Sequence, residues 1–388
     1  MSSLQRTIEN LRAQNRAWHQ RSAGAQPLRD AAAASTFKQH AHFGTNPGAL
    51  RMFSYIPDNM PATRSLVVVL HGCTQSAAAY AVGAGWKSLA DRHGFALLLP
   101  AQDSANNQNG CFNWFQRSDT QRGQGEALSI FQMIEAMVAE QDIDRDRIFV
   151  TGLSAGGAMT SVMLACYPEV FAAGAIIAGL PFGVAGNVQQ AFETMFHGSG
   201  KSGEQLAALV RAAAPASFRK WPRISIWHGE ADKTVVPVNG REIAAQWTSL
   251  HHLATQATMT TTVSGARRDV WLNDAGVEAV EAYFIPGMGH GTPVAPGIAQ
   301  DQCGQVGPFI LDAGIASSFH IARFFGLTGM EVAAGADVTS SRQPDRFRLP
   351  EVAPRPAKAR ADETEAPRGN SIQAIIESAL KAAGLIKS

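Results

Sequence analysis

The sequence predicts an α/β protein built on a doubly wound, mostly parallel sheet. Short apolar, β-branched runs alternate with helical patterns from about residue 50 to residue 327. This alternation is typical of a parallel sheet that carries helices on both faces. The composition agrees, because the 388 residues are 45% hydrophobic and 17% charged, which is ordinary for a globular protein.

The strands are expected where the apolar runs occur. The run 65–72, SLVVVLHG, contains a continuous apolar, β-branched stretch, as a strand buried on both faces requires. The other expected strands are 50–56, 95–102, 146–152, 172–180, 223–229 and a last one from Val277 to residue 287.

The helices are expected between these strands. A helical pattern covers 85–94 and ends at Gly94, a good C-cap. Apolar residues recur at helical spacing over 125–141. A helix of small residues should follow residue 154 and run to Tyr167, and a closing helix is expected over 317–327.

Four segments lie outside this alternation of strands and helices. Residues 181–222 are expected to form either a cap over the site or a surface excursion. Residues 1–35 are expected to be an N-terminal arm with a possible short helix, preceding a catalytic domain over 36–335. The Pro-rich, charged stretch 336–370 is expected to be a disordered linker, and 371–388 an amphipathic helix that docks on the domain, a partner or an apolar granule surface.

Charge and cysteine content exclude several classes of protein. The net charge of +1 gives no basic field for nucleic acid, and no apolar run reaches the roughly 18 residues of a membrane span. The N-terminus has basic residues but no apolar core, so it does not resemble a Sec signal peptide. The cysteines, Cys73, Cys111, Cys166 and Cys303, form no CxxC pair and argue against zinc; Cys166 is expected to be a small buried residue.

The sequence GLSAGGAM, residues 152–159, carries the candidate nucleophile. Ser154 lies between Gly152 and Gly156, directly after an expected strand and before an expected helix. This is the setting of a nucleophile elbow, in which a sharp turn holds the serine and the helix N-terminus faces the developing oxyanion.

The candidate acid and base follow in the order Ser, acid, His. Asp232 lies in the loop after the strand 223–229, with Glu230 as a competing acid in the same loop. His290 lies between two glycines in GMGHG, after the last expected strand. A hydroxyl needs a base, and the base needs a carboxylate that orients it, so Ser154, His290 and Asp232 are expected to form a triad.

An early loop should complete the oxyanion hole. In VVVLHGCTQS the amide of Cys73 or Thr74 is expected to donate together with that of Ala155. His71 and His228, each followed by glycine, are expected to hold their loops rather than to take part in catalysis.

The loop NGCFNWFQ, residues 109–116, opens at the same end of the sheet. Cys111 could therefore meet Cys73 near the site, as a disulfide in a secreted protein or as thiols in a reducing cytosol. Trp86, Trp114 and Trp227 are candidates for an apolar acyl pocket, with ordinary core packing as the alternative for each.

Together these motifs resemble the polyhydroxybutyrate depolymerase family of esterases. The resemblance covers about residues 40–330 and is carried by LHGCTQSAAAYAVGAGWKSLADRHGFALLLPAQ, GCFNWF, GLSAGGAM, WHGEADKTVVPVNG and GMGHG. It implies an α/β-hydrolase with no cofactor, in which Ser154, Asp232 and His290 are the triad and the Cys73 loop forms the oxyanion hole. Feruloyl and acetylxylan esterases share these motifs.

We therefore expect a serine esterase acting on poly(3-hydroxybutyrate) or 3-hydroxyalkanoate oligomers. Feruloyl or acetylxylan esters are the alternative substrates, and a peptidase is a further option on the same fold. A catalytically idle protein tethered to a granule or partner by residues 371–388 is the alternative of another class. The resemblance favours a secreted protein, whereas the absence of a recognisable signal peptide favours the cytoplasm, and the compartment stays open.

Overall fold

The computed structural model describes residues 35–329. The arm, the linker and the tail helix expected over 1–35, 336–370 and 371–388 lie outside the described residues, apart from residue 35. The predictions for these segments therefore stay predictions.

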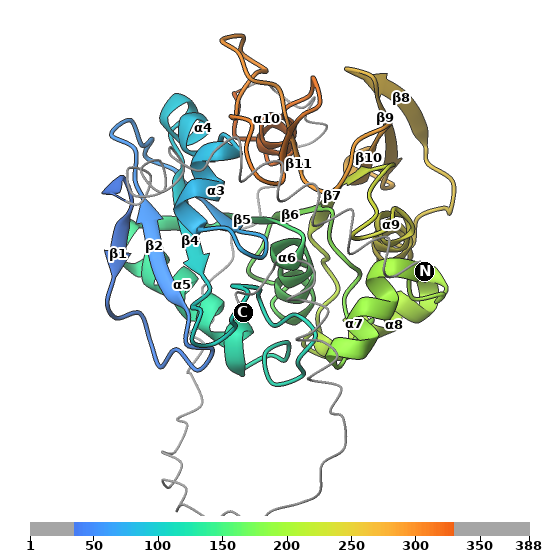
Figure 1. Ribbon diagram of the computed structural model, residues 1–388, viewed down its shortest axis with the longest axis horizontal. Coiled ribbons are helices and arrows are strands. Elements are labelled where there is room, and N and C mark those ends of the chain that lie inside the picture. The colour runs from blue at the N-terminus through green and yellow to red at the C-terminus, as the bar shows by residue number, and fades with distance from the viewer. Residues whose placement is uncertain (1–34, 330–388) are drawn as a thin grey trace, which may run out of the picture.

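Within the described part of the chain, ten strands form the main sheet, in the order β1-β2-β4-β3-β5-β6-β7-β10-β9-β8 (Figure 1). The strands from β4 to β10 in this order run parallel, whereas β1, β2, β9 and β8 pair antiparallel at the two edges. The strands are β1 Lys38–His40, β2 Arg51–Tyr55, β3 Arg64–Leu70, β4 Ala96–Ala101, β5 Ile143–Leu153, β6 Ala173–Ile177, β7 Arg223–Gly229, β8 Met259–Val263, β9 Ala266–Leu272 and β10 Glu278–Ile285. The mostly parallel sheet predicted from the sequence is confirmed.

Helices cover both faces of this sheet, as a doubly wound fold requires. On one face lie α3 Ala77–Gly83, α4 Trp86–His93 and α10 Ser317–Phe324, which share a core with residues such as Val67 and Leu97. On the other face lie α5 Gly125–Gln141, α6 Ala155–Cys166, α8 Gly203–Ala213 and α9 Val238–Leu250, whose buried residues share a second core with Leu66 and Val68. Figure 1 shows the first group above the sheet and α5, α6 and α8 below it.

The central helix α6 is buried along its whole length. Its residues are small or apolar, so the helix can lie between the sheet and its neighbours without exposing a polar face. The helix begins directly after Ser154, which places that serine at the carboxyl end of β5, in the middle of the sheet.

The excursion 181–222 contains two helices, α7 Val188–His197 and α8. Both begin with a side-chain cap: Asn187 accepts from the amide of Gln190, and Ser202 accepts from that of Gln205 in a capping box. The excursion is therefore ordered structure packed on α9, and the sequence prediction had not resolved its helices.

The antiparallel hairpin β8–β9 and the short pair β11 Thr292–Val294 with β12 Ile310–Asp312 were not predicted. Two residues, Ser264 and Gly265, connect β8 to β9, and both have positive φ. That is the conformation of a tight hairpin turn. The strand β8 is largely exposed, so it lacks the continuous apolar run by which the central strands were recognised.

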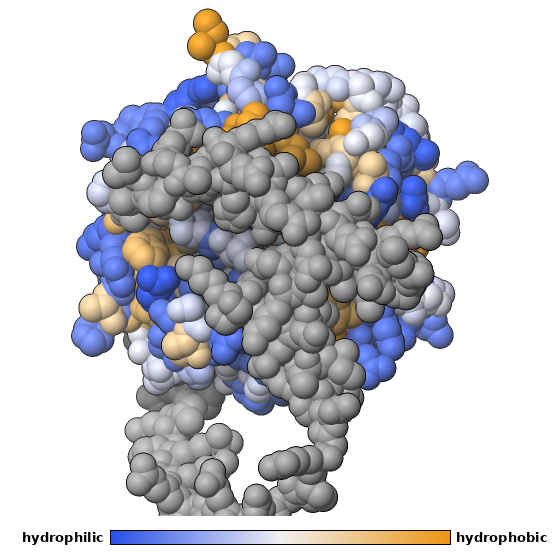
Figure 2. Space-filling view, in the orientation of Figure 1, coloured by the Kyte–Doolittle hydropathy of each residue, from blue (hydrophilic) through white to orange (hydrophobic). Residues whose placement is uncertain are grey.

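The surface is mixed in character. Figure 2 shows mostly hydrophilic residues on the visible ungreyed surface and a hydrophobic tip at the upper edge. Within residues 35–329 the exposed large hydrophobic side chains are Met259, Val277, Ile298 and Val306. No helix in this part of the chain is long and apolar enough to cross a membrane.

Candidate active site

Ser154 sits on a strained turn between β5 and α6. Its backbone angles, φ of 57° and ψ of −116°, lie outside the regions that residues other than glycine ordinarily adopt. Such a conformation costs about 1–3 kcal/mol. The two flanking glycines make the turn possible. A Cβ on Gly152 would lie 2.4 Å from the carbonyl oxygen of Gly156, and one on Gly156 would lie 2.3 Å from that of Leu70. The spacing of the glycines around Ser154 thus reflects a close approach of strand and helix.

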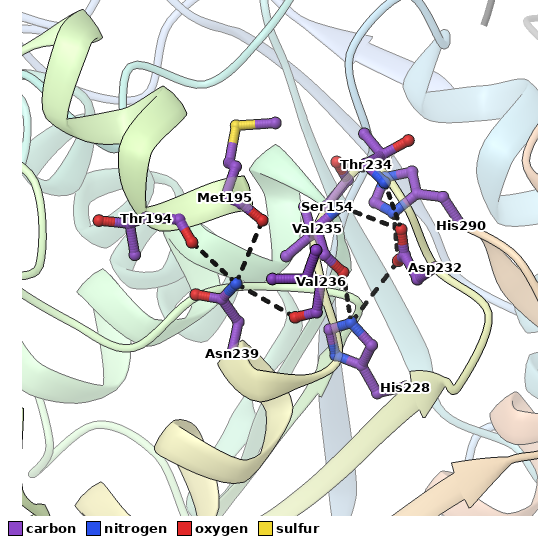
Figure 3. A network of polar contacts seen from close by, with 10 residues as sticks. All are labelled: Ser154, Thr194, Met195, His228, Asp232, Thr234, Val235, Val236, Asn239 and His290. Carbon is purple, nitrogen blue, oxygen red and sulfur yellow. Dashed lines mark hydrogen bonds and ion pairs between the residues drawn. The ribbon is translucent and has the colours of Figure 1, made fainter. Parts of the chain in front are cut away.

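His290 joins the serine to the acid. Its Nε2 lies 2.9 Å from Ser154 Oγ and its Nδ1 lies 2.7 Å from Asp232 Oδ2. The imidazole comes from the loop after β10, and the carboxylate from the loop after β7 (Figure 3). The structure therefore brings the three predicted residues together in one hydrogen-bonded chain.

The Asp232 carboxylate is fully buried and held from two sides. Its Oδ1 accepts from the amides of Thr234 and Val235, at 2.8 and 2.9 Å, so Oδ2 is left to face His290. Burial alone would raise the pKa of Asp232, but the charge and hydrogen bond of His290 outweigh it and the pKa is lowered. The acid is ionised at neutral pH.

Glu230, the competing acid, points elsewhere. Its side chain is 42% exposed, with its carboxylate 4.0 Å from the guanidinium of Arg241. Its backbone contributes instead, because the amide of Glu230 donates to the carbonyl of Ile285 at 2.9 Å and that of Ala231 donates to Met288. These bonds tie the acid loop to the loop that carries His290.

The two predicted structural histidines brace loops at the site. The amide of Gln102 donates to His71 Nε2, so the Nδ1–H of that ring donates to the carbonyl of Gly72. Burial lowers the pKa of His71 to about 4, which keeps the ring neutral. His228 Nε2 lies 2.8 Å from the carbonyl oxygen of Val235 and supports the acid loop from behind.

The expectation that the Thr74 amide lines the oxyanion hole is wrong. Thr74 has a φ of 63°, and its N–H donates to the carbonyl of Asn109 at 2.8 Å. Within residues 35–329 the amides of Cys73 and Ala155 donate to no protein group. The latter is the first amide of α6, where the helix dipole favours negative charge. Cys73 and Ala155 therefore remain the candidate donors.

Cys73 and Cys111 form a disulfide, so their predicted meeting is confirmed. The bond joins the loop after β3 to the loop after β4, both at the carboxyl edge of the sheet. Together with the bond from Thr74 to Asn109, it fixes the backbone around the Cys73 amide.

We expect reduction of this disulfide to lower the free energy of unfolding. The two cysteines are 38 residues apart. A cross-link of that span lowers the conformational entropy of the unfolded chain and thereby stabilises the folded state by about 2–4 kcal/mol. Urea unfolding with and without a reductant measures the difference, and the Cys111→Ser variant should show no further effect of the reductant. An equal midpoint in both conditions would contradict the expectation.

Two of the three tryptophans do not belong to a pocket. Trp86 and Trp227 are completely buried in the core layer under α3, α4 and α10. Trp227 stacks on Tyr283 at 3.8 Å between ring centroids, so its position on β7 points it into the core. The pocket assignment of both is therefore corrected. Trp114 packs on the other face in the same cluster as Ala155 and stays a candidate.

A buried carboxyl that sequence reasoning missed holds the Trp114 loop. Glu126, at the start of α5, is fully buried, and its Oε2 accepts from the amide of Asn113 at 2.8 Å. Its Oε1 accepts from the side-chain amides of Asn113 and Gln102. Burial raises the pKa of Glu126 to about 8, against the effect of these donors. The helical pattern of 125–141 gave no sign that this residue faces inward.

No group of three or more His, Cys, Asp or Glu side chains is arranged to hold a metal ion in residues 35–329. The polar contacts of the site are those between its own side chains and loops.

Comparisons with known proteins identify a family of esterases to which this chain is similar. A family model described as Esterase PHB depolymerase matches residues 51–271, a range that includes Ser154 and Asp232 and ends before His290. Poly(3-hydroxyalkanoate) depolymerase C of Paucimonas lemoignei is 48% identical over 291 residues, which are 75% of this chain and 70% of that protein.

Two further relatives come from fungi. Feruloyl esterase B of Talaromyces stipitatus is 30% identical over 282 residues, 71% of this chain and 77% of its own. An acetyl xylan esterase structure from Aspergillus awamori superposes with a TM-score of 0.60 at 26% identity, covering 66% of this chain and 93% of that one.

Proposed function

This chain belongs to the PHB depolymerase family of carboxylic ester hydrolases, and we propose that Ser154 is its nucleophile, His290 its base and Asp232 the acid that orients the base. The observation that carries the proposal is the continuous hydrogen-bonded chain from Ser154 Oγ through the imidazole to the carboxylate. Asp232 accepts from Nδ1–H, which leaves Nε2 free to accept the serine proton.

The first half of the reaction forms an acyl-enzyme. Ser154 Oγ attacks the ester carbonyl carbon while its proton passes to His290 Nε2. The oxyanion is held by the amides of Ala155 and Cys73. The bond to the leaving oxygen then breaks, and His290 returns the proton to the departing alcohol.

Water completes the cycle. His290 removes a proton from a water molecule, and the hydroxide attacks the acyl carbon. When the second tetrahedral intermediate collapses, the proton returns to Ser154 Oγ and the carboxylic acid leaves. The charged imidazolium that forms twice in each cycle is stabilised by the Asp232 carboxylate.

For the substrate we infer 3-hydroxyalkanoate oligomers or polyester. Support comes from the depolymerase relative at 48% identity, compared with 30% for the feruloyl esterase. The loop with Phe115 and the excursion with Phe182 and Met195 also carry partly buried apolar side chains that pack on the Ala155 side of the sheet. These side chains suit an aliphatic acyl chain.

A substrate panel tests this choice. We expect the purified protein to hydrolyse 3-hydroxybutyrate dimers and trimers with a kcat/KM at least about tenfold above that for methyl ferulate or acetylated xylan, since a mismatched acyl group typically costs 1–3 kcal/mol of transition-state binding. Released acids are measured by chromatography, with Ser154→Ala as the blank. Good turnover of the ferulate without turnover of the oligomers would reverse the order of the two candidates.

A further inference from the structure

Three polar side chains of α9 form a buried seam against the excursion. Asn239, Glu242 and Gln246 are three and four residues apart, so they lie along one side of the helix. Their exposed fractions are 0%, 9% and 0%. Polar groups this deep need partners. The Glu242 carboxylate, the Gln246 amide and the Asn239 NH₂ group find partners in the backbone of the excursion, whereas Asn239 Oδ1 has no hydrogen-bond partner within residues 35–329.

Two of these residues, Glu242 and Gln246, form side-chain hydrogen bonds only with the excursion among the described residues. The Glu242 carboxylate accepts from the amides of Ser199 and Gly200, each at 2.9 Å. Gln246 accepts from the amide of Phe182 at 3.0 Å and donates to the carbonyls of Phe182 and Leu206. These hydrogen bonds fix where the excursion lies, and none of them involves the loop of Asp232.

Asn239 reaches both the excursion and the acid loop. Its Nδ2 lies 2.9 Å from the carbonyl oxygen of Thr194 in α7, 3.4 Å from that of Met195 and 3.2 Å from that of Val236. Figure 3 shows Asn239 between the end of α7 and the acid loop. One buried amide therefore connects two segments that are far apart in sequence.

The path from this amide to the carboxylate is short. The Val236 amide donates to the carbonyl of Met195 at 2.8 Å, so the two segments are also joined directly. The preceding residue, Val235, donates its amide to Asp232 Oδ1 and accepts from the ring of His228. A shift of α7 would therefore move the peptide groups that aim the carboxylate.

We propose that Asn239 is a positioning residue that locks α7 to the acid loop, so that the alignment of Asp232 with His290 depends on the seating of the excursion. The inference rests on the proposed triad. It predicts that removing the Gln246 side-chain amide leaves the alignment of Asp232 and His290 intact, whereas removing that of Asn239 disturbs it.

A matched pair of variants tests this. Asn239→Ala and Gln246→Ala each remove one buried side-chain amide from α9, and each leaves main-chain groups of the excursion without their partner. The substrate is p-nitrophenyl acetate, whose acyl group is too small to need the excursion. Thermal unfolding of both variants supplies the stability against which the rates are compared.

We expect Asn239→Ala to lower kcat about 10- to 100-fold with little change in KM, as a displaced catalytic group does. We expect Gln246→Ala to keep kcat within about twofold, because its contacts do not reach the acid loop. Equal losses of kcat in the two variants, or an unchanged kcat in Asn239→Ala, would overturn the proposal. If Asn239→Ala does not fold, Asn239→Ser keeps one donor and should give a smaller loss in the same direction.

A double mutant tests whether the effect passes through the acid. In an Asp232→Asn background, Asn239→Ala should change kcat by less than about twofold, because residues that act as one unit are non-additive. A full additional loss in that background would show that Asn239 acts by another route. If Asp232→Asn alone retains the wild-type kcat, the result contradicts the proposed triad itself and not the role of Asn239.

Discussion

We expect Ser154→Ala to lower kcat for p-nitrophenyl butyrate by a factor on the order of 10⁵ to 10⁶. The substitution removes the atom that would form the acyl-enzyme, and His290 Nε2 at 2.9 Å loses its proton donor. The amides of the oxyanion hole stay in place, so a small residual rate over water is expected. Stopped assays with high enzyme concentration measure that residual rate.

A serine on the same helix provides the control. Ser161 is buried in α6, and its hydroxyl donates to the carbonyl of Leu180, away from the triad. We expect Ser161→Ala to keep kcat within about threefold, because a lost buried hydrogen bond costs roughly 1 kcal/mol of stability and touches no reacting atom. Comparable losses in the two variants would indicate a disturbed α6 rather than a lost nucleophile.

Asp232→Asn should lower kcat by about 10⁴. The asparagine oxygen can keep the bonds from the amides of Thr234 and Val235 to the Oδ1 position. Its NH₂ group then faces His290 Nδ1, where the carboxylate accepts at 2.7 Å. The imidazole is forced into the tautomer whose Nε2 carries the hydrogen, and that nitrogen can no longer accept the serine proton.

Glu230→Gln separates the two acids of this loop. The side chain of Glu230 is half-exposed and faces Arg241, and exposed ion pairs of this kind contribute about 0–1 kcal/mol. We expect kcat to stay within about twofold. A large loss in Glu230→Gln with a small one in Asp232→Asn would exchange the roles of the two carboxylates.

Much of the sheet could be predicted because its central strands have no solvent-facing side. The centres of runs such as 65–72 and 95–102 are apolar without interruption, and the corresponding β3 and β4 are buried almost throughout. The hairpin β8–β9 was not predicted for the opposite reason: β8 is mostly exposed and polar and so shows no apolar run, although only two residues separate it from its partner β9.

The triad could be placed because each member follows a recognisable strand. Ser154 directly follows β5, and Asp232 and His290 lie in the loops that follow β7 and β10, so topology alone brings them to one edge of the sheet. Side-chain direction is harder to predict. For Trp227 the sequence leaves both a pocket and a core position open, but a residue on β7 faces one side of the sheet only, and the stack on Tyr283 fills the core there.

The buried polar residues that hold the loops of the site could not be predicted from the sequence. Glu126 and Asn239 are polar residues in ordinary helical patterns, and they matter through backbone groups of segments that are distant in the chain. The same holds for the Thr74 amide, whose bond to Asn109 depends on how two loops meet. Such contacts are fixed by tertiary packing, and no local pattern encodes them.

Covalent trapping of the nucleophile tests the central claim most directly. The protein is treated with diisopropyl fluorophosphate, and the modified residue is located by peptide mass spectrometry. We expect one phosphoryl adduct on Ser154 that grows in parallel with the loss of esterase activity and is absent in Ser154→Ala. Loss of activity with the adduct on another residue, or full labelling of Ser154 with activity retained, would contradict the assignment of Ser154 as the nucleophile.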